Sequence, residues 1–195
     1  MKIREYEAAD EPGWLRCRVV AFLDCSYFND VKTEKERYAH PSVCLVAEES
    51  ETIIGLIDAE IDSDDLTCAK NERGAVIWNL AVLPEFRRRG VAGALWEQAR
   101  ARLIEQGVHY CELWTQEDEA ANRFYRSAGF ALEDAQTWIR CYAEGKACLP
   151  LLNREALGIL YGPEELVFDA PLSRKAELKE CCYRIDEVRL YSIRF

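Results

Sequence analysis

The 195-residue sequence contains no apolar stretch that approaches the roughly 18 residues needed to cross a bilayer. Its first residues, Met1 to Tyr6, also lack the apolar core of a signal peptide. These absences argue against a helical membrane protein and against secretion. We therefore expect a cytoplasmic protein with no membrane partner.

Basic residues are too few for a nucleic-acid-binding surface. Lys and Arg number 25 against 35 Asp and Glu, so the net charge is −10 at pH 7. A protein that binds nucleic acid without regard to its sequence needs a cationic surface that displaces counterions. The composition argues against a nucleic-acid partner and is compatible with a cationic acceptor such as an amine.

Metal-ligand patterns are scarce as well. The two histidines, His40 and His109, lie far apart, and the nine cysteines include no C-x-x-C pair. We therefore expect no metal site and mostly reduced cysteines in the core. Two phosphate-binding signatures are also missing: the G-x-x-x-x-G-K-[ST] of a P-loop and the G-x-G-x-x-G of a dinucleotide site.

The sequence is organised around the stretch from Val76 to Leu103. Its first part, Val76 to Leu83, is a short apolar run rich in β-branched residues, which predicts a buried strand that ends at Pro84. Apolar residues with helical spacing follow and predict a helix with one buried face. These apolar residues are Ala92, Leu95, Trp96, Ala99 and Leu103.

Arginines and small residues fill the turn between this strand and helix. Arg87 to Arg89 come first, and Gly90 and Gly93 follow. The first turn of a helix has backbone N–H groups without internal partners and a positive dipole, so this segment is suited to hold phosphate. The alternative is an ordinary strand–turn–helix unit with a solvated basic patch.

Two motifs resemble one known family. The pattern L-x-V-x-P-x-x-R-x-x-G-x-A over residues 80–92 resembles the acetyl-CoA signature of the GCN5-related N-acetyltransferases (GNAT). The pattern A-x-x-F-Y-x-x-x-G-F over residues 121–130 is similar to the second segment of the same family. The resemblance implies an acetyl-CoA-dependent N-acetyltransferase that moves an acetyl group to a primary amine of a small molecule or protein, by direct attack in a ternary complex. The alternative is a non-catalytic acyl-CoA-binding sensor or regulatory protein on the same fold.

The resemblance also implies the fold class. We expect an α/β protein with one domain over residues 1–195, in which helices flank a mixed, mostly antiparallel sheet with splayed parallel central strands. Residues 143–182 depart from the family layout and are predicted to form an insertion between the last two strands. The expected strands are Lys2–Tyr6, Ser42–Glu48, Thr52–Ile61, Val76–Leu83, His109–Thr115, an extended stretch from Phe130 to Tyr142, and Glu187–Phe195. The other expected elements are helices near Asp10–Tyr27, Asn153–Leu160 and Ser173–Cys182, a helix opening at Gln116–Glu119, and turns at Ser63–Gly74 and Gly162–Pro163.

Cofactor contacts follow from the resemblance in two groups. The pantetheine arm of acetyl-CoA would lie along the central strand, and its pyrophosphate would lie on the arginine–glycine turn. The residues assigned to the cofactor are Leu80, Ala81, Val82, Arg87, Arg88, Arg89, Gly90, Val91, Ala92, Gly93, Asn122 and Tyr125. The family usually has Asn where this sequence has Asp118, so either Asp118 serves only as a helix cap or Asn122 takes over some cofactor contacts.

The resemblance assigns Tyr125 as the catalytic group that protonates the leaving sulfur. Its alternative role is packing beside Phe124. Some relatives carry a glutamate on the central strand, where Val76 to Leu83 has no carboxylate. We therefore expect either that Glu60, with Asp58 as second choice, acts as the base through water, or that no dedicated base exists.

Three carboxylates, those of Asp58, Glu60 and Asp62, fall on one face of the predicted strand Thr52–Ile61. They form either a solvated sheet face or a group close to the acceptor amine. The resemblance also suggests acceptor contacts from the segment after the first helix, at Asp24, Tyr27, Phe28 and Asp30. The identity of the amine stays open, and a homodimer through the C-terminal strands is a further expectation.

Overall fold

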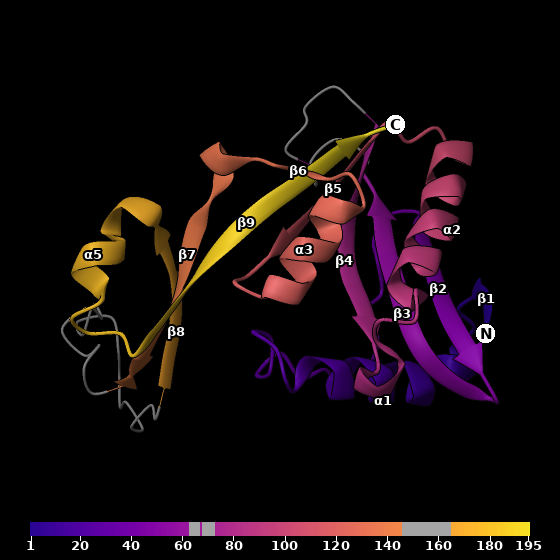
Figure 1. Ribbon diagram of the computed structural model, residues 1–195, viewed down its shortest axis with the longest axis horizontal. Helices are drawn as coiled ribbons and strands as arrows, with labels where there is room; N and C mark the ends of the chain where they lie inside the picture. Colours follow the sequence, from indigo (N-terminus) through magenta and orange to yellow (C-terminus); the bar gives the residue numbers. More distant parts are fainter. Residues whose placement is uncertain (63–66, 68–72, 146–164) are drawn as a thin grey trace.

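A computed structural model describes residues 1–62, 67, 73–145 and 165–195. Its strands lie in the order β1-β2-β3-β4-β5-β9-β7-β8, with β6 paired to β9 (Figure 1). The strands are β1 (Lys2–Glu5), β2 (Ser42–Glu49), β3 (Thr52–Ile61), β4 (Gly74–Val82), β5 (Tyr110–Thr115), β6 (Ala131–Leu132), β7 (Trp138–Glu144), β8 (Glu165–Pro171) and β9 (Arg184–Arg194). The helices are α1 (Glu11–Phe22), α2 (Val91–Glu105), α3 (Glu119–Ser127) and α5 (Lys175–Leu178). The predicted helix Asn153–Leu160, the turn Gly162–Pro163 and most of Ser63–Gly74 lie outside the described residues.

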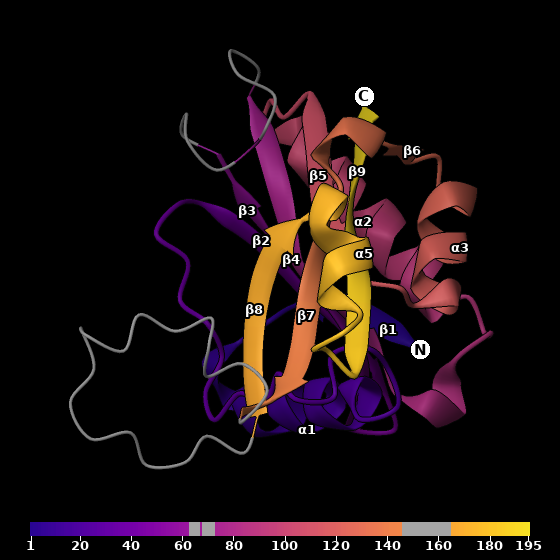
Figure 2. The same ribbon diagram turned by 90° about the vertical axis from the view of Figure 1, so that its left-hand side faces the viewer.

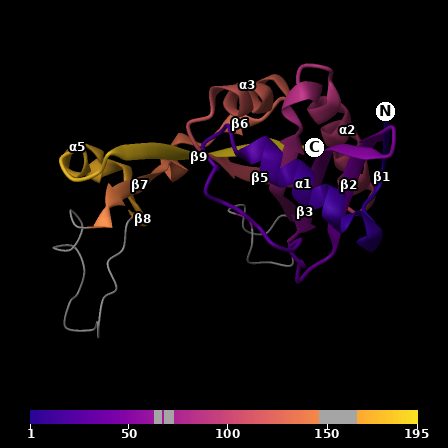
Figure 3. The same ribbon diagram turned by 90° about the horizontal axis from the view of Figure 1, so that it is seen from below.

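Helices cover both faces of the main sheet. Figure 3 shows α2 and α3 on one side and α1 on the other. A Cβ on Gly55 of β3 would lie 2.9 Å from Val91 of α2, so glycine lets that helix pack against the strand. The pairing register of β2 and β3 shifts between Ala47 and Glu48, next to Gly55, which marks a bulge in this hairpin. The core between sheet and helices is apolar and includes Trp14, Leu56 and Trp96.

The central strands β4 and β5 are parallel and then part. They are in register only from Gly74 to Val76 of β4, opposite Tyr110 to Glu112 of β5. Trp78 is an extra residue in β4, because Asp58 of β3 pairs with Asn79 and Ala59 pairs with Ile77. A bulge of this kind bends the strand. The structure therefore confirms the predicted splay, and we call the opening between residues 77–82 of β4 and the end of β5 the fork.

The long strand β9 belongs to two sheets (Figure 1). Its residues 189–194 pair with β5, and its residues 184–188 pair with β7. Together with β8, these segments form an outlying sheet that α5 covers in Figure 2. A small second core lies there, made of Ile139, Cys141, Ala170 and Leu178.

Several predicted details need correction. Helix α1 ends at Phe22 rather than near Tyr27. The described part of the predicted insertion contains the unpredicted strand β8, and the helix expected over Ser173–Cys182 is a 3₁₀ turn followed by the short α5. The face that α3 buries most completely carries Asn122 and Tyr125, and Ala121, Phe124 and Ala128 are partly buried. Within the described ranges, no helix is both long and apolar enough to cross a membrane.

Candidate functional site

The turn before α2 exposes a run of backbone amides. Gly90 is the N-cap of α2 with a φ of 79°, and no side chain caps the helix there. The amide of Ala94 donates to the carbonyl of Gly90 at 2.9 Å, whereas the amides of residues 88–93 donate to no other described residue. A Cβ on Gly90 or Gly93 would meet nothing within 4 Å. The turn therefore offers free donors and open space, which is what an anion requires.

The three arginines of the turn differ in their surroundings. Arg87 forms two hydrogen bonds with Asp24, at 2.8 and 2.9 Å, and a third with the carbonyl of Ala21 at 2.8 Å. This pairing lowers the pKa of the Asp24 carboxyl below its usual range. The Arg87 guanidinium thus ties the turn to the end of α1. Arg88 and Arg89 are exposed, and the Arg89 guanidinium lies 4.9 Å from the centre of the Phe86 ring.

Along the fork, no described strand pairs with one edge of β4. On its other edge, Leu80, Ala81 and Val82 pair with residues 57, 56 and 55 of β3. On the fork side, the register with β5 stops at Val76. The backbone of residues 77–82 can therefore receive an extended ligand in the manner of an added strand.

Tyr125 lies on α3 in an aromatic cluster. Its ring centre is 5.4 Å from that of Phe124, 5.8 Å from that of Phe130 and 6.0 Å from that of Tyr191. Burial raises the pKa of the Tyr125 phenol above its usual value. The phenol therefore keeps its proton at neutral pH and can serve as a donor.

The start of α3 is held by local hydrogen bonds. The Asp118 carboxylate accepts from the amides of Ala120 and Ala121, at 2.9 and 3.2 Å, which confirms the predicted cap. The Asn122 side chain donates to the carbonyls of Gln116 and Asp118, at 2.8 and 2.7 Å, and accepts from Tyr191 at 3.0 Å. A cofactor contact from Asn122 stays a prediction, because both hydrogens of its amide are already used within the protein.

The carboxylates of Asp58 and Glu60 on β3 and of Asp62 directly after it are buried, so the solvated-face interpretation is wrong. Asp58 is 0% exposed and Asp62 is 7% exposed. The Nζ atom of Lys35 lies 3.3 Å from Oδ1 of Asp58, and burial raises the pKa of that carboxyl. Asp62 accepts hydrogen bonds from the amide and hydroxyl of Thr67.

Glu60 lies at the closed end of the fork. It stands opposite Val76, the last residue of β4 in register with β5. One carboxylate oxygen lies 3.0 Å from Nδ1 of His40 and accepts from its amide at 3.1 Å. The other oxygen accepts from the indole of Trp78 at 2.8 Å.

A buried polar network organises the segment after α1. Arg18, 2% exposed, donates to Asn79 of β4 at 2.7 Å and to the carbonyl and carboxylate of Asp30, each at 2.7 Å. The amide nitrogen of Asn79 donates to the Tyr38 hydroxyl at 3.2 Å. Sequence patterns missed Arg18 and His40, because each lies far along the chain from its partner and outside both motifs.

The four residues expected to contact the acceptor have separate surroundings. Asp24 binds Arg87, and Asp30 binds Arg18. The Tyr27 hydroxyl accepts from the amide of Gln116 at 3.0 Å. Phe28 is 42% exposed and the Asp24 side chain is 53% exposed, so both stay accessible.

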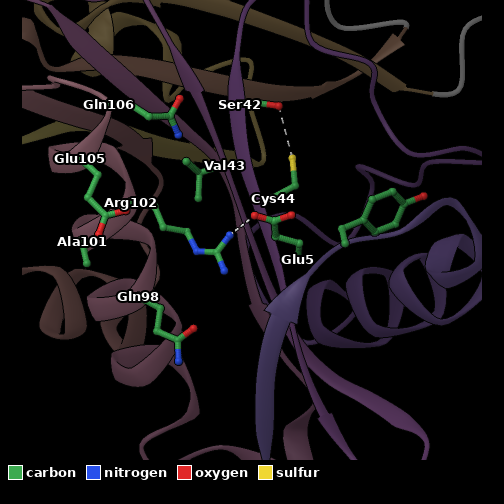
Figure 4. A pocket seen from close by; sticks show the side chains of 10 residues that line it. Glu5, Ser42, Val43, Cys44, Gln98, Ala101, Arg102, Glu105 and Gln106 are labelled. Atoms are coloured by element: carbon green, nitrogen blue, oxygen red, sulfur yellow. Dashed lines mark hydrogen bonds and ion pairs between the residues drawn. The ribbon is translucent and has the colours of Figure 1, made fainter.

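Hollows in the surface of the described residues include two that bear on the site. One of about 380 Å³ lies between the end of α1 and the start of α3, and is lined by Asp24, Cys25, Ser26, Glu117, Asp118, Glu119 and Arg184. Its lining is mostly acidic and includes the partner of Arg87. The other, of about 810 Å³, lies beside the C-terminal half of α2 and β2 (Figure 4). Its residues, such as Arg102 and Cys44, are remote from the turn before α2, so we do not assign the chemistry to it.

Comparison with known proteins connects these features to one family. Residues 3–130 match the model of the acetyltransferase (GNAT) family. The ribosomal-protein-S18-alanine N-acetyltransferase of Escherichia coli is 15% identical, with a TM-score of 0.57, over 99% of this chain and 92% of that chain. The ribosomal-protein-alanine N-acetyltransferase of Brucella melitensis is 14% identical, with a TM-score of 0.58, over 100% of both chains. An aminoglycoside 6′-N-acetyltransferase of Acinetobacter haemolyticus is 21% identical, with a TM-score of 0.52, over 67% of this chain and 91% of that chain. At these identities the three structures establish a shared fold.

Proposed function

Since the chain belongs to the GNAT family of acetyl-CoA-dependent N-acetyltransferases, we propose that it transfers the acetyl group of acetyl-CoA to a primary amine by direct attack in a ternary complex. The observation that carries this proposal is the continuity of the fork with the open amides of residues 88–93. One strand–turn–helix unit thereby offers a strand edge for an extended arm and an anion site for a pyrophosphate.

The residues of this unit fit the donor. Leu80 and Val82 would hold the pantetheine arm through backbone hydrogen bonds on the fork side of β4, whereas the carbonyl of Ala81, between them, points toward β3. The amides of residues 88–93, with the exposed Arg88 and Arg89, would hold the pyrophosphate. Arg87 would contribute by fixing the turn, because its guanidinium is engaged with Asp24 and Ala21.

Bound acetyl-CoA supplies an activated thioester carbonyl. The protein aligns the two reactants, and alignment alone provides a large part of such rate enhancements. Tyr125 would donate a proton to the departing sulfur, a role that its retained phenolic proton supports.

We propose that the acceptor amine is protonated, and so a cation, when it binds. The acidic hollow at the start of α3 and the net charge of −10 both favour an ammonium over an anionic acceptor. Both a small molecule and a protein amine are compatible with these features, and the structural neighbours include an acetyltransferase of each kind.

Calorimetric titration with acetyl-CoA tests the cofactor site. Gly93→Glu is the informative variant: Gly93 lies inside α2, so a side chain there does not need the positive φ of Gly90, and its carboxylate would repel a pyrophosphate. Ala101→Glu adds the same group at an exposed position of the same helix and serves as control.

We expect one-to-one binding by the wild type and Ala101→Glu, and at least tenfold weaker binding by Gly93→Glu. Absence of saturable binding by the wild type at about millimolar acetyl-CoA would contradict the proposed function. Release of CoA on adding spermidine, an aminoglycoside or a peptide with a free N-terminal alanine then separates an enzyme from a non-catalytic binding protein.

A further inference from the structure

An imidazole and a buried carboxylate meet at the closed end of the fork. The carboxylate of Glu60 is 5% exposed and accepts two hydrogen bonds from His40 and one from Trp78. Both of its oxygens are therefore engaged. A substrate amine that approached Glu60 directly would have to displace one of these donors.

The contact between Glu60 and His40 fixes the state of the imidazole. An ionised carboxylate only accepts hydrogen bonds, so Nδ1 of His40 must donate across the 3.0 Å contact. In the neutral ring the hydrogen then resides on Nδ1, and Nε2 carries a lone pair. The His40 side chain is 31% exposed, so the ring is accessible to other molecules.

His40 and Glu60 lie where an acceptor amine would meet the bound acetyl-CoA. Trp78, whose indole binds Glu60, is the bulged residue at which β4 leaves β5, and it is 49% exposed. Leu80 follows Trp78 by two residues, on the edge of β4 that is proposed to hold the pantetheine arm of acetyl-CoA. The other two buried carboxylates of this face are engaged elsewhere, Asp58 with Lys35 and Asp62 with Thr67.

We propose that His40 is the base that takes a proton from the acceptor ammonium through Nε2, and that Glu60 is the positioning residue that holds its ring. This inference rests on the proposed function and names the proton acceptor of that same site. Glu60 thus acts through His40 rather than on the amine itself.

The proton balance of this scheme closes. A primary alkyl amine has a pKa of about 10.4, so it arrives as an ammonium and gives one proton to Nε2 of His40. The freed lone pair forms the new C–N bond to the acetyl carbon, and the C–S bond breaks with its electron pair left on sulfur. Tyr125 gives its proton to that sulfur and regains one, through water, from the nitrogen of the new amide. His40 returns its proton to solvent, so each turnover releases one proton.

The kinetic test compares His40→Ala with His109→Ala, which removes the other, exposed histidine. We expect kcat of His40→Ala to fall by about 10²-fold or more while KM for acetyl-CoA stays unchanged. Imidazole added to the assay should restore part of that rate. His109→Ala should keep the wild-type rate with and without imidazole. An unchanged kcat in His40→Ala, or a loss that imidazole does not relieve, would overturn the assignment.

Glu60→Gln tests the positioning role. Its kcat should fall. Added imidazole should not restore the rate, because the His40 ring still occupies the space that free imidazole would need. Its affinity for acetyl-CoA should remain that of the wild type. Rescue of Glu60→Gln by imidazole, or a wild-type kcat, would contradict a role through His40.

A nuclear magnetic resonance measurement tests the geometry without turnover. In His109→Ala protein the single remaining histidine is His40, and its neutral ring should show the hydrogen on Nδ1 in ¹⁵N spectra. A hydrogen on Nε2 would overturn the proposal. If the wild type binds acetyl-CoA but acetylates none of spermidine, an aminoglycoside and the alanine peptide, the proposed function fails, whereas the position of this hydrogen still reports on His40 separately.

Discussion

At the scale of single residues, burial sets the chemistry of the side chains around the fork. Tyr125 and Asp58 have the same cause for their shifted pKa values, namely the loss of water around the charged form. The consequence differs between the two groups. The phenol keeps its proton and can donate it, whereas the charged carboxylate is stabilised by the ammonium of Lys35. Each residue therefore yields a separate prediction.

Replacing Tyr125 with Phe should lower kcat by about 10²-fold and leave KM for acetyl-CoA unchanged. Because burial raises the pKa of Tyr125 above its ordinary value of 10.0, the protonated form persists to higher pH. The ratio of wild-type to Tyr125→Phe rates should therefore stay constant from about pH 7 to about pH 10. A ratio that declines as pH approaches 10 would show that the phenol titrates normally.

Removing Lys35 should destabilise the fold strongly. Lys35→Met leaves the buried Asp58 carboxylate without its cation, and breaking a buried pair in this way costs about 3–5 kcal/mol. Lys32→Met removes a more exposed lysine that pairs with Asp30 and Glu36, and should cost less than about 1 kcal/mol. Urea unfolding at neutral pH measures both.

The loss in Lys35→Met should depend on pH with a definite sign. A carboxyl whose folded pKa is raised contributes stability at low pH and loses it as pH rises. The unfolding free energy of Lys35→Met should therefore approach that of the wild type as pH falls toward the ordinary aspartate value of 3.8. A loss of the same size at acid and neutral pH would mean that Asp58 is not the cause.

Residue roles could be predicted from sequence only where partners are close along the chain. Asp118 caps a helix that begins at the next residue, so its role followed from local spacing. His40 lies 20 residues from Glu60, and Arg18 lies 61 residues from Asn79. Such pairings are created by packing of the segment after α1 against the sheet, and no periodic pattern in the sequence encodes them.

At the scale of elements, the predictable parts were those with a strong local signal. The strand β3 has its predicted bounds, and β2 differs by one residue, because alternating apolar residues and a hairpin turn define them. Helix α1 ends at Phe22, earlier than predicted, and the Arg87 guanidinium bonds the carbonyl of Ala21 in its last turn. The strand β8 was missed because it is an edge strand with a largely exposed surface.

Loss of the α3 cap should weaken that helix measurably. Asp118→Ala removes the acceptor for the amides of Ala120 and Ala121 and should cost about 1 kcal/mol of unfolding free energy. Glu119→Ala changes an exposed neighbour in the first turn and should cost less than about 0.5 kcal/mol. Chemical denaturation of the two variants distinguishes them, and equal effects would argue against the cap.

At the scale of the whole molecule, stability should be uneven. The main sheet packs against a large core on both faces, whereas the outlying sheet of β7, β8 and the start of β9 has a core of four buried residues. Local opening is easier where few apolar side chains are buried. This contrast could not be predicted from the sequence, because it depends on how β9 is divided between two sheets.

Hydrogen–deuterium exchange should reveal this unevenness. Backbone amides of the β7–β8 pair should exchange faster than those of the β2–β3 pair, although both pairs are antiparallel. Peptides from the two pairs in one digest provide the comparison at a single pH and temperature. Equal protection would show that the outlying sheet opens only with the whole protein.

The fork also makes the folded population depend on what fills it. After Val76, β4 and β5 share no hydrogen-bond ladder, and a ligand can fill the fork between them. The unfolded chain has no fork, so such a ligand binds only the folded protein. An occupant of this kind adds about 2.7 kcal/mol to the unfolding free energy when its concentration is about 100 times its Kd. Resistance to proteases follows the same population, because they cleave opened chains. The abundance of the protein in a cell would thus rise and fall with the supply of its own acetyl donor.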